Sequence, residues 1–420
     1  MKNILMVVKF FHSAIYFYFC IQHYEKQKII ISKITKGLIL YALAIVNLYM
    51  KILLLGEYSN VHWTLAQGLR ALGHHVTVVS DGDVWKNYPR DISLKRKSIN
   101  TIGGIKYLVD LWRILPKLTG YDVVQIINPM FLSLKAERHY FYYHFLRRHN
   151  KSLFMGAFGM DYYWVCTGLD GHTFRYSDFN IGTSIRKNKD NDAFISEWLE
   201  GEPGRLNRYI AKDCDGIITG LYEYDACYRP IFPEKTCFIP FPINIDEVHV
   251  TAPTYTGGKI RFFIGIQQSR DAYKGTDIMY RALIKLADKY PDRMEIVKAI
   301  SVPYNTYCHM LNSSHILLDQ LYSYTPAMNG LLAMAKGLVL VGGGEPENYI
   351  ILNENQLHPI INVLPSENDV YNKLEKLLMS PDQIPTLSAQ SREYILRHHD
   401  YKKVAQKYID FWTTSQNKHI

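Results

Sequence analysis

Cysteine is scarce in this 420-residue chain, and none of it is arranged for a structural role. The six cysteines form no Cys-x-x-Cys pair, and no histidine stands at the spacing of a zinc ligand. A disulfide scaffold and a structural zinc site are therefore not expected. The simplest interpretation is a protein of a reducing compartment, and we expect it in the cytoplasm.

Long apolar runs are also missing. A membrane-spanning helix needs about 18 or more consecutive apolar residues. The nearest candidate, residues 4–21, is broken by Lys9 and His12. The sequence therefore does not predict a membrane span.

Acidic and basic residues nearly balance outside the first part of the chain. The net charge is +9, and residues 1–49 hold six lysines against one acid, Glu25, so they account for +5 and the rest of the chain for +4. A nucleic-acid-binding protein concentrates its cations on one face. The bulk charge does not indicate that class, and we expect no nucleic-acid partner.

Residues 1–49 differ in character from the rest. Two apolar stretches, around 10–20 and 38–49, flank a lysine-rich segment at 26–36, and neither ends in a small-x-small cleavage site. The segment is an extension outside the working fold, a membrane-proximal anchor or an integral element. We favour the extension, because Met50 directly precedes an apolar, strand-like run.

From residue 50 onward, short apolar runs alternate with helical-length amphipathic segments, as in parallel sheets covered by helices. The expected strands of a first series are 51–55, 76–80, 123–127, 152–157 and 216–220, with helices at 62–72 and 131–149. The expected strands of a second series are 260–264, 294–299, 316–318 and 338–341, with helices at 277–290 and 328–336. The predicted fold class is α/β, with two doubly wound Rossmann-like domains facing a central cleft.

Proline and glycine mark the expected domain boundaries. The segment 238–242 contains two prolines and is interpreted as the linker. We predict an acceptor domain at 50–242, a donor domain at 243–390 and, at 391–420, a terminal helix that packs across both.

Three segments carry a resemblance to a known family. The opening at 51–56 and the run 71–79 resemble the first strand, helix and strand of glycosyltransferases with two Rossmann-like domains (the GT-B fold). The segment 269–277 (SRDAYKGTD) resembles the Arg-x-x-x-Lys-Gly loop of the retaining family 4, or group 1, enzymes. The segment 330–337 (GLLAMAKG) resembles their Glu-Ala-Met-Ala-x-Gly helix, and the glycine-rich 342–345 follows it.

The resemblance implies a donor site in the second domain. Arg270 and Lys274 would hold the donor's diphosphate and stabilise the charge that grows on it, and Gly275 would allow close approach of the backbone. We predict that both cations are catalytic. Taken alone, they would be read as ordinary solvated loop charges.

The sequence departs from the family at two positions. Tyr324 and Leu332 stand where the family carries two glutamates, which face the donor sugar and the ribose. The remaining donor-binding candidates, beside Gly56 and Tyr324, are Asn329, Gly344, Glu345 and Glu347. A cap at a helix start is the other interpretation of Glu345 and Glu347.

Loops of the first domain are expected to line the acceptor side. Gly56, Glu57 and Tyr58 follow the first strand, and the glycine lets a ligand approach the backbone. Asp161 follows a later strand, in a Gly-x-Asp segment that resembles one near the family's active site, and is predicted to position the acceptor hydroxyl or accept its proton. A turn residue that bonds its own backbone is the alternative for Asp161.

Two further segments have an open role. The long, aromatic stretch 162–204 is expected to be irregular, and either closes over an acceptor sugar or is a structural insertion. The basic stretch 95–97 and the helix-like 105–118 form a basic, apolar patch that suits an anionic membrane surface. A core helix with solvated lysines is the alternative for this patch.

The leading functional hypothesis is a retaining, metal-independent glycosyltransferase of surface polysaccharide assembly. It moves a sugar from a nucleotide-sugar donor to a glycan or lipid-linked acceptor, needs no cofactor, and works in the cytoplasm or at the inner face of the cell membrane. No metal site is expected, because neither domain shows an Asp-x-Asp motif placed to hold the diphosphate; the motif at 81–83 fits the spacing but ends the second strand of the other domain. The alternatives are a non-catalytic nucleotide-sugar-binding protein, a sugar-nucleotide epimerase, or a nicotinamide-dependent oxidoreductase, although no Gly-x-Gly-x-x-Gly follows either domain's first strand.

Overall fold

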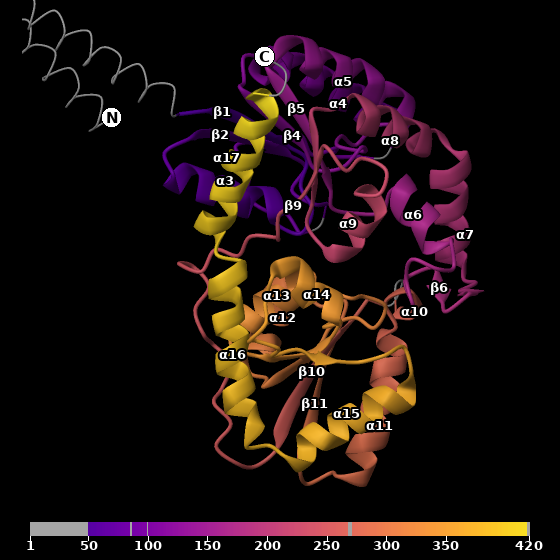
Figure 1. The fold of residues 1–420 in the computed structure, drawn as a ribbon, viewed down its shortest axis with the longest axis vertical. Coiled ribbons are helices and arrows are strands. Elements are labelled where there is room, and N and C mark those ends of the chain that lie inside the picture. Colours follow the sequence, from indigo (N-terminus) through magenta and orange to yellow (C-terminus); the bar gives the residue numbers. More distant parts are fainter. Residues whose placement is uncertain (1–48, 85, 99, 268–270, 418–420) are drawn as a thin grey trace, which may run out of the picture. The chain divides into compact units, whose positions relative to one another are not determined.

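The computed structural model describes residues 49–84, 86–98, 100–267 and 271–417 (Figure 1). Lys51–Ile420 cluster as one compact unit. The expected extension at 1–49 therefore lies, except for Tyr49, outside the described residues. Two parallel sheets covered by helices make up the compact unit, which we describe as a first and a second lobe.

A seven-stranded sheet forms the first lobe, in the order β3-β2-β1-β4-β5-β8-β9. Its strands are β1 (Lys51–Leu55), β2 (His75–Ser80), β3 (Ile92–Ser93), β4 (Val123–Ile126), β5 (Ser152–Ala157), β8 (Gly216–Thr219) and β9 (Thr236–Phe238). All neighbours pair in parallel, with Ile52 opposite both Val76 and Val123. The central strands read as continuous apolar runs because helices cover both faces.

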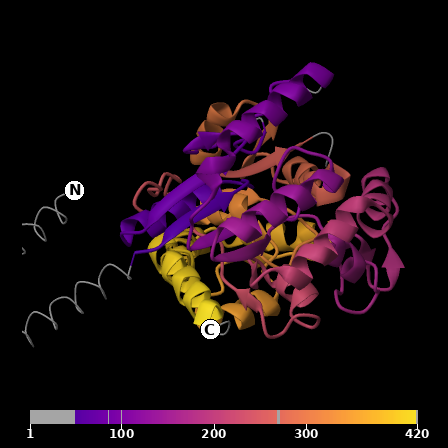
Figure 2. The same ribbon diagram turned by 90° about the horizontal axis from the view of Figure 1, so that it is seen from above.

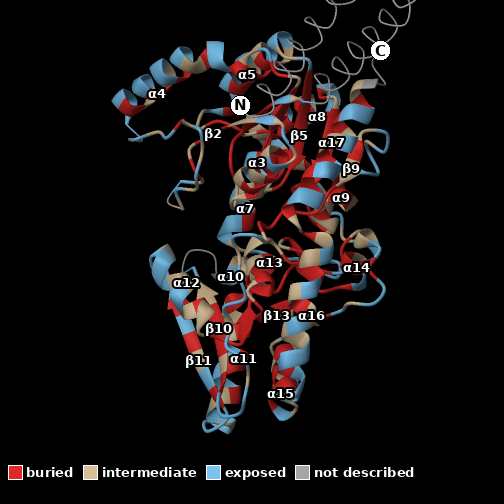
Figure 3. Ribbon diagram, turned by 90° about the vertical axis from the view of Figure 1, so that its left-hand side faces the viewer, coloured by how far each residue is buried: buried red, intermediate tan, exposed pale blue. Residues whose placement is uncertain are grey.

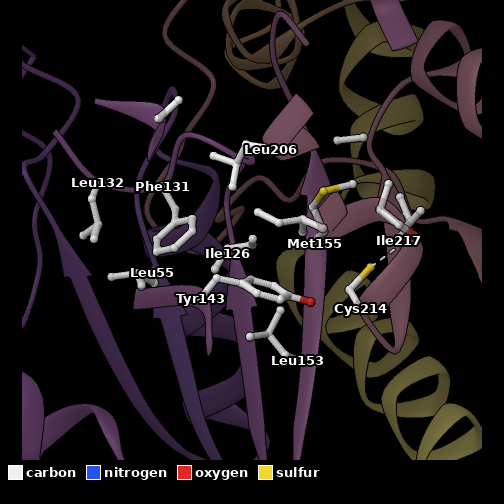
Figure 4. Packing of buried hydrophobic residues seen from close by; sticks show 14 of the residues in the cluster. Leu55, Ile126, Phe131, Leu132, Tyr143, Leu153, Met155, Leu206, Cys214 and Ile217 are labelled. Atoms are coloured by element: carbon white, nitrogen blue, oxygen red, sulfur yellow. Dashed lines mark hydrogen bonds between the residues drawn. The ribbon is translucent and has the colours of Figure 1, made fainter. Parts of the chain in front are cut away.

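The helices of this lobe hold its core against the sheet. They are α3 (Val61–Ala71), α4 (Thr101–Ile114), the short 3₁₀ helix η1 (Leu115–Leu118), α5 (Ala136–His149), α6 (Tyr162–Gly168), α7 (Lys189–Ile195), the π-helical turn η2 (Ser196–Glu200), α8 (Glu202–Asp213) and α9 (Tyr222–Tyr228). Figure 4 shows Leu55, Ile126 and Met155 of the strands packed with Tyr143 of α5 and Leu206 of α8. This core fixes the strand ends from which the loops of the site extend.

Several expected boundaries differ from the structure. The stretch 162–204 is not irregular, since it contains α6, the hairpin strands β6 (Asn180–Ile181) and β7 (Ser184–Ile185), α7, η2 and the start of α8. The helix expected at 131–149 begins only at Ala136, because the backbone of Lys135 is extended (ψ 148°) and does not continue a helix toward residue 131. The Ser133 backbone N–H, in the loop before the helix, donates to the Tyr107 hydroxyl (3.0 Å). Phe238, placed in the linker, ends the edge strand β9, since backbone pairing to Thr219 extends the sheet to that point.

The second lobe has a five-stranded parallel sheet in the order β11-β10-β12-β13-β14. Its strands are β10 (Ile260–Ile266), β11 (Met294–Ile300), β12 (Ile316–Leu318), β13 (Val339–Gly342) and β14 (Ile361–Asn362). Its helices are α10 (Asp271–Lys274), α11 (Thr276–Lys289), α12 (Tyr304–Asn312), α13 (Met328–Ala335), α14 (Pro346–Leu352) and α15 (Glu367–Met379).

The C-terminal segment forms two helices rather than one. The α16 helix (Gln383–His398) packs on α13 and β13 of the second lobe, and α17 (Tyr401–Asn417) packs on α3 of the first (Figures 1 and 2). The helix is interrupted at His399 because the chain there forms backbone hydrogen bonds with Ile243, which lies in the segment that first connects the two lobes. The Ile243 backbone N–H donates to the His399 carbonyl (2.7 Å), and the Tyr401 N–H donates to the Ile243 carbonyl (3.1 Å).

Candidate functional site

A cleft of about 1020 Å³ is lined by loops of both lobes. The first lobe contributes the loops that follow β1 and β2, and the second contributes the loops after β10, β11 and β12 together with the start of α13. These are the carboxyl ends of parallel strands, where ligands of open α/β sheets bind. The cleft is therefore the candidate functional site.

A hydrogen-bonded network forms the second-lobe wall of the cleft. Asn329, in the first turn of α13, donates from Nδ2 to Asp319 Oδ1 (2.8 Å), and the Tyr307 hydroxyl donates to Asn329 Oδ1 (2.8 Å). Asp319 follows β12 directly and is buried. Burial raises the pKa of Asp319, while the positive charge of Lys274 and the Asn329 hydrogen bond oppose that rise. Fixed donors and acceptors of this kind suit recognition of a polyhydroxylated ligand.

Lys274 lies on the same wall, just before the N-terminus of α11. Its carbonyl accepts the Leu321 backbone N–H (2.9 Å), which ties this loop to the chain after β12. Gly275 between Lys274 and α11 has φ of 73°, and a Cβ there would lie 2.7 Å from the Leu321 Cβ. Only glycine fits this turn. A cation beside the N-terminus of a 14-residue helix is suited to bind a phosphate.

The other predicted phosphate ligand, Arg270, lies outside the described residues. Lys274 is thus the one member of the predicted pair that the described chain places in the cleft.

The first-lobe wall is built from two strained loops. Ser59, Asn60 and Asp83 all have positive φ (51°, 70° and 60°). Asp83 Oδ2 accepts the Ser59 backbone N–H (2.8 Å) and the Lys86 ammonium (2.7 Å), so the loop after β1 is tied to the loop after β2. Strained backbone held by such contacts clusters at functional sites.

Sequence reasoning placed the loop after the first strand on this wall, but it missed the roles of Asp83 and Lys86, as well as Asp319 and Tyr307. For Asp319 a signal was present, because an acid directly after the apolar run 316–318 falls at the carboxyl end of an expected strand. No comparable signal marked Lys86. Asp83 had been noted only as part of an Asp-x-Asp motif.

Three of the predicted first-lobe residues do not line the cleft. Gly56, with φ of 87°, packs its α-carbon against Ile127. Glu57 is buried, and its two carboxylate oxygens accept the backbone N–H groups of His62 (3.1 Å) and Trp63 (2.8 Å) at the start of α3. Burial raises the pKa of Glu57 to about 8. Tyr58 likewise is not among the residues that line the cleft, and its ring lies against Gly159.

Asp161 is also buried, and it is not among the residues that line the cleft. Its Oδ1 accepts the Trp164 backbone N–H (2.8 Å) and caps α6, and its Oδ2 accepts the Tyr228 hydroxyl (2.7 Å). Burial raises the pKa of Asp161 to about 6, against the lowering effect of these donors. These contacts are those of a structural cap, which agrees with the alternative of a residue that bonds its local backbone.

The acids proposed as donor-sugar ligands make contacts between the lobes. Glu345 accepts the Tyr176 hydroxyl (2.6 Å), and both Glu345 (2.9 Å) and Glu347 (2.5 Å) pair with Arg175. Tyr324 accepts the Arg175 backbone N–H at its hydroxyl (2.7 Å). None of these residues lines the cleft.

Gly344 and Leu332 are the remaining positions considered for the donor side. A Cβ on Gly344 would lie 2.7 Å from Ile360 Cγ2, so this glycine serves close packing and is not among the cleft residues. Leu332, where the family carries a carboxylate, does line the cleft. The ribose-binding role of that carboxylate is therefore not available at this position.

Among the described residues, no group of three or more His, Cys, Asp or Glu side chains is arranged to hold a metal ion. None of the described helices is long and apolar enough to cross a membrane.

Comparison with known proteins places this architecture. No model of a known protein family matches the chain, and no curated protein matches its sequence. Sucrose-phosphate synthase from Thermosynechococcus elongatus superposes with a TM-score of 0.57 at 13% identity, covering 87% of this chain and 98% of that one. Anabaena Alr3699/HepE, solved in complex with UDP-glucose, gives 0.54 at 11% identity, covering 87% and 100%. A putative UDP-N-acetylglucosamine 2-epimerase from Listeria monocytogenes gives 0.50 at 10% identity, covering 86% and 95%.

At identities this low the likeness establishes the fold and not the reaction. The protein has the GT-B fold, with two Rossmann-like domains that face each other across the cleft.

Proposed function

We propose that this protein is a glycosyltransferase that moves a sugar from a nucleotide-sugar donor to a glycan or lipid-linked acceptor. The observation that carries the proposal is the second-lobe wall of the cleft, where Lys274 and the N-terminus of α11 lie on the same wall as Asp319 and Asn329. This wall pairs a phosphate-binding element with fixed hydrogen-bonding groups for hydroxyls. Binding of UDP-glucose by a protein of the same fold supports a nucleotide-sugar donor.

Lys274 is proposed to bind the donor's diphosphate as a compact positive charge. The leaving diphosphate gains negative charge in the transition state, so a cation and helix-start amides fixed beside it stabilise the transition state more than the bound donor. Arg270 is proposed as the second cation on the strength of the family resemblance. With two fixed cations in this role, the transfer is proposed to be metal-independent.

Recognition of the sugar and ribose hydroxyls is assigned to Asp319 and Asn329 in place of the family's glutamates. Asn329 bonds both Asp319 and Tyr307, which fixes the orientation of its amide. A ligand without a hydroxyl at this point would remove water from the Asp319 carboxylate without donating a hydrogen bond to it, and such a mismatch is costly.

The acceptor is proposed to bind against the first-lobe wall at Ser59, Asp83 and Lys86. These groups line the same cleft as Lys274. The reaction is proposed to retain the anomeric configuration. In a retaining transfer the leaving diphosphate can itself take the acceptor's proton, so the buried position of Asp161 is compatible with transfer.

Surface polysaccharide assembly at the inner face of the cell membrane is the proposed setting. A sugar-nucleotide epimerase is the second candidate, because a putative one shares the fold. An epimerase changes the donor's sugar without needing an acceptor, so the two functions are separable by experiment.

The test is a panel of nucleotide sugars incubated with the protein, with and without glycan acceptors. Released nucleotide and the recovered sugar nucleotide are both measured. Acceptor-dependent release of nucleotide is expected. Conversion of the sugar nucleotide without an acceptor would establish the epimerase instead, and saturable nucleotide binding with neither reaction would establish a binding protein.

A further inference from the structure

We propose that the outward face of α4 docks on an anionic membrane surface. This inference concerns where the protein works rather than the transfer reaction, and it stands on the exposure and charge of α4. Figure 3 shows α4 at the periphery of the first lobe, with much of its surface exposed.

The α4 helix is apolar on two faces. Gly103, Tyr107 and Leu111 are buried and hold the helix on the lobe. Ile102, Ile105, Val109 and Trp112 form a second row on the outward side, with 64%, 58%, 43% and 62% of their surfaces exposed. Spacings of three, four and three residues place this row along one side of a helix.

The exposed row extends onto the neighbouring helix. Phe141 of α5 is 51% exposed, and its ring centroid lies 6.0 Å from that of Trp112. Five large apolar side chains thus gather on one surface, which we call the α4 ridge. Isolated exposed apolar residues are ordinary, but a contiguous group marks an interaction surface.

The charges beside the α4 ridge select an anionic partner. Residues 94–117 hold six cations and one acid, Asp110. The cations are Lys95, Arg96, Lys97, Lys106, Arg113 and Lys117. Arg113 carries the ion pair with Asp110 (3.6 Å), in which both side chains are largely exposed.

This combination matches the chemistry of an interfacial helix. The Ile, Val, Trp and Phe side chains of the ridge enter the boundary between headgroups and acyl chains, while Lys and Arg at their flank pair with anionic headgroups. A second copy of this chain would bring the cations of both copies together, so charge complementarity favours the lipid surface.

The position of α4 gives this surface a functional consequence. The Tyr107 hydroxyl accepts the Ser133 N–H (3.0 Å), and the Ser133 hydroxyl donates to Asp81 (3.4 Å) at the end of β2. The loop that follows β2 supplies Asp83 and Lys86 to the cleft. The proposed membrane-binding helix and the acceptor wall of the cleft are therefore connected through the same hydrogen bonds. This connection suits an acceptor carried on a lipid, a point that rests on the proposed function.

The test is sedimentation of the full-length chain with vesicles of phosphatidylcholine, with and without phosphatidylglycerol. Binding to the anionic vesicles is expected, with weakening by salt. The Ile105→Glu/Trp112→Glu variant is expected to bind at least tenfold more weakly. The Lys106→Gln/Arg113→Gln variant is expected to lose roughly tenfold or more, because each cation near an anionic surface contributes several-fold to binding.

Ile231→Glu is the matched control, since Ile231 is an exposed isoleucine of the same lobe outside the ridge (55% exposed). It is expected to bind vesicles like the wild type. Thermal unfolding and nucleotide binding of all variants are measured alongside, and unchanged values show that the lobe remains folded.

Vesicle binding that survives both α4 variants would overturn the proposal and move the binding elsewhere, for example to residues 1–49. Absence of vesicle binding in the wild type would overturn it as well. So would a dimer, seen by light scattering, that the Ile105→Glu/Trp112→Glu variant dissociates without any vesicle binding. Nucleotide release with a water-soluble acceptor does not depend on the ridge, so failure of this inference is distinct from failure of the proposed function.

Discussion

Arg175 of the first lobe and Glu347 of the second form an ion pair (2.5 Å) between residues 172 positions apart in the chain. The same guanidinium reaches Glu345 (2.9 Å) and lies over the Tyr324 ring, 4.8 Å from its centroid. These contacts tie the segment between α6 and β6 to the loop and helix start after β13. They also explain why these acids face the other lobe rather than the cleft.

This pair is expected to contribute modestly to stability. Arg175 remains 54% exposed, so solvent screens it. A double-mutant cycle of Arg175→Gln and Glu347→Gln is expected to give a coupling energy of about 0.5–1 kcal/mol in unfolding. Arg205→Gln with Glu202→Gln, a pair of similar exposure three residues apart within α8, is the control and is expected to give about 0.3–0.5 kcal/mol. A large loss of nucleotide affinity in Glu347→Gln, with stability unchanged, would return this acid to the donor site.

Lys274 is expected to be needed for nucleotide binding. A charge-assisted hydrogen bond to phosphate is worth roughly 1.5–3 kcal/mol, so Lys274→Ala is expected to weaken UDP binding by about tenfold to a hundredfold and to reduce turnover further. Lys285→Ala, an exposed lysine of α11, is the control. Calorimetric titration measures both, and equal affinities of the two variants would remove Lys274 from the site.

Asp161 is expected to act on stability rather than on the reaction. Asp161→Asn keeps a capping oxygen for α6 but cannot accept the Tyr228 hydroxyl in the same way, and is expected to cost about 1–3 kcal/mol in denaturant unfolding. Turnover of the folded fraction is expected to stay within a few-fold of the wild type. A loss of turnover by a hundredfold or more without any loss of stability would restore the catalytic role.

Two buried histidines are expected to make the protein sensitive to acid. Burial lowers the pKa of His62 and of His399 to about 3. The unfolded chain takes up these protons below its ordinary pKa of about 6.5, whereas the folded chain does not, so stability falls as the pH drops from there toward 3.

A substitution of His399 allows the direction of this pH effect on stability to be measured. Its Nδ1 bonds the Phe241 carbonyl (2.8 Å), and an Asn amide at this position can donate the same bond. Going from pH 8 to pH 5, His399→Asn is expected to lose about 2 kcal/mol less unfolding free energy than the wild type. Denaturant unfolding at both pH values measures it, and identical pH dependences would show that His399 is charged in the fold.

Removal of residues 1–49 is expected to leave the folded unit intact. Lys51–Ile420 cluster as a compact unit of their own, and β1 begins at Lys51. A chain that starts at Met50 is expected to unfold at the same temperature as the full-length chain, within about 2 °C, by calorimetry. Loss of cooperative unfolding in the shorter chain would make the segment an integral element.

Periodicity in the sequence was enough to predict the α/β class and the central strands. Uninterrupted apolar runs such as 52–55 and 316–318 indicate strands that are buried on both faces of a sheet. The signal lies within the run itself, because neighbouring residues of a strand point to opposite faces. The family resemblance of 269–277 likewise pointed to Lys274, which lines the cleft, and to Gly275, whose turn only glycine fits. The sequence pattern predicted edge strands and helix starts less accurately. Phe238 is a strand residue because it pairs with Thr219 of another strand. The start of α5 at Ala136 follows from the extended backbone of Lys135.

The sequence by itself therefore determined the layered fold and the position of one loop of the cleft, the loop that carries Lys274. Only the tertiary structure decided which acids face the cleft. Asp319 and Asp83 line it, whereas Glu345 and Glu347 bond Arg175, and Asp161 caps a helix. The physical reason is that a carboxylate's role depends on the donors that surround it, and Arg175, the donor to both Glu345 and Glu347, lies in the other lobe, 170 and 172 positions away in the chain.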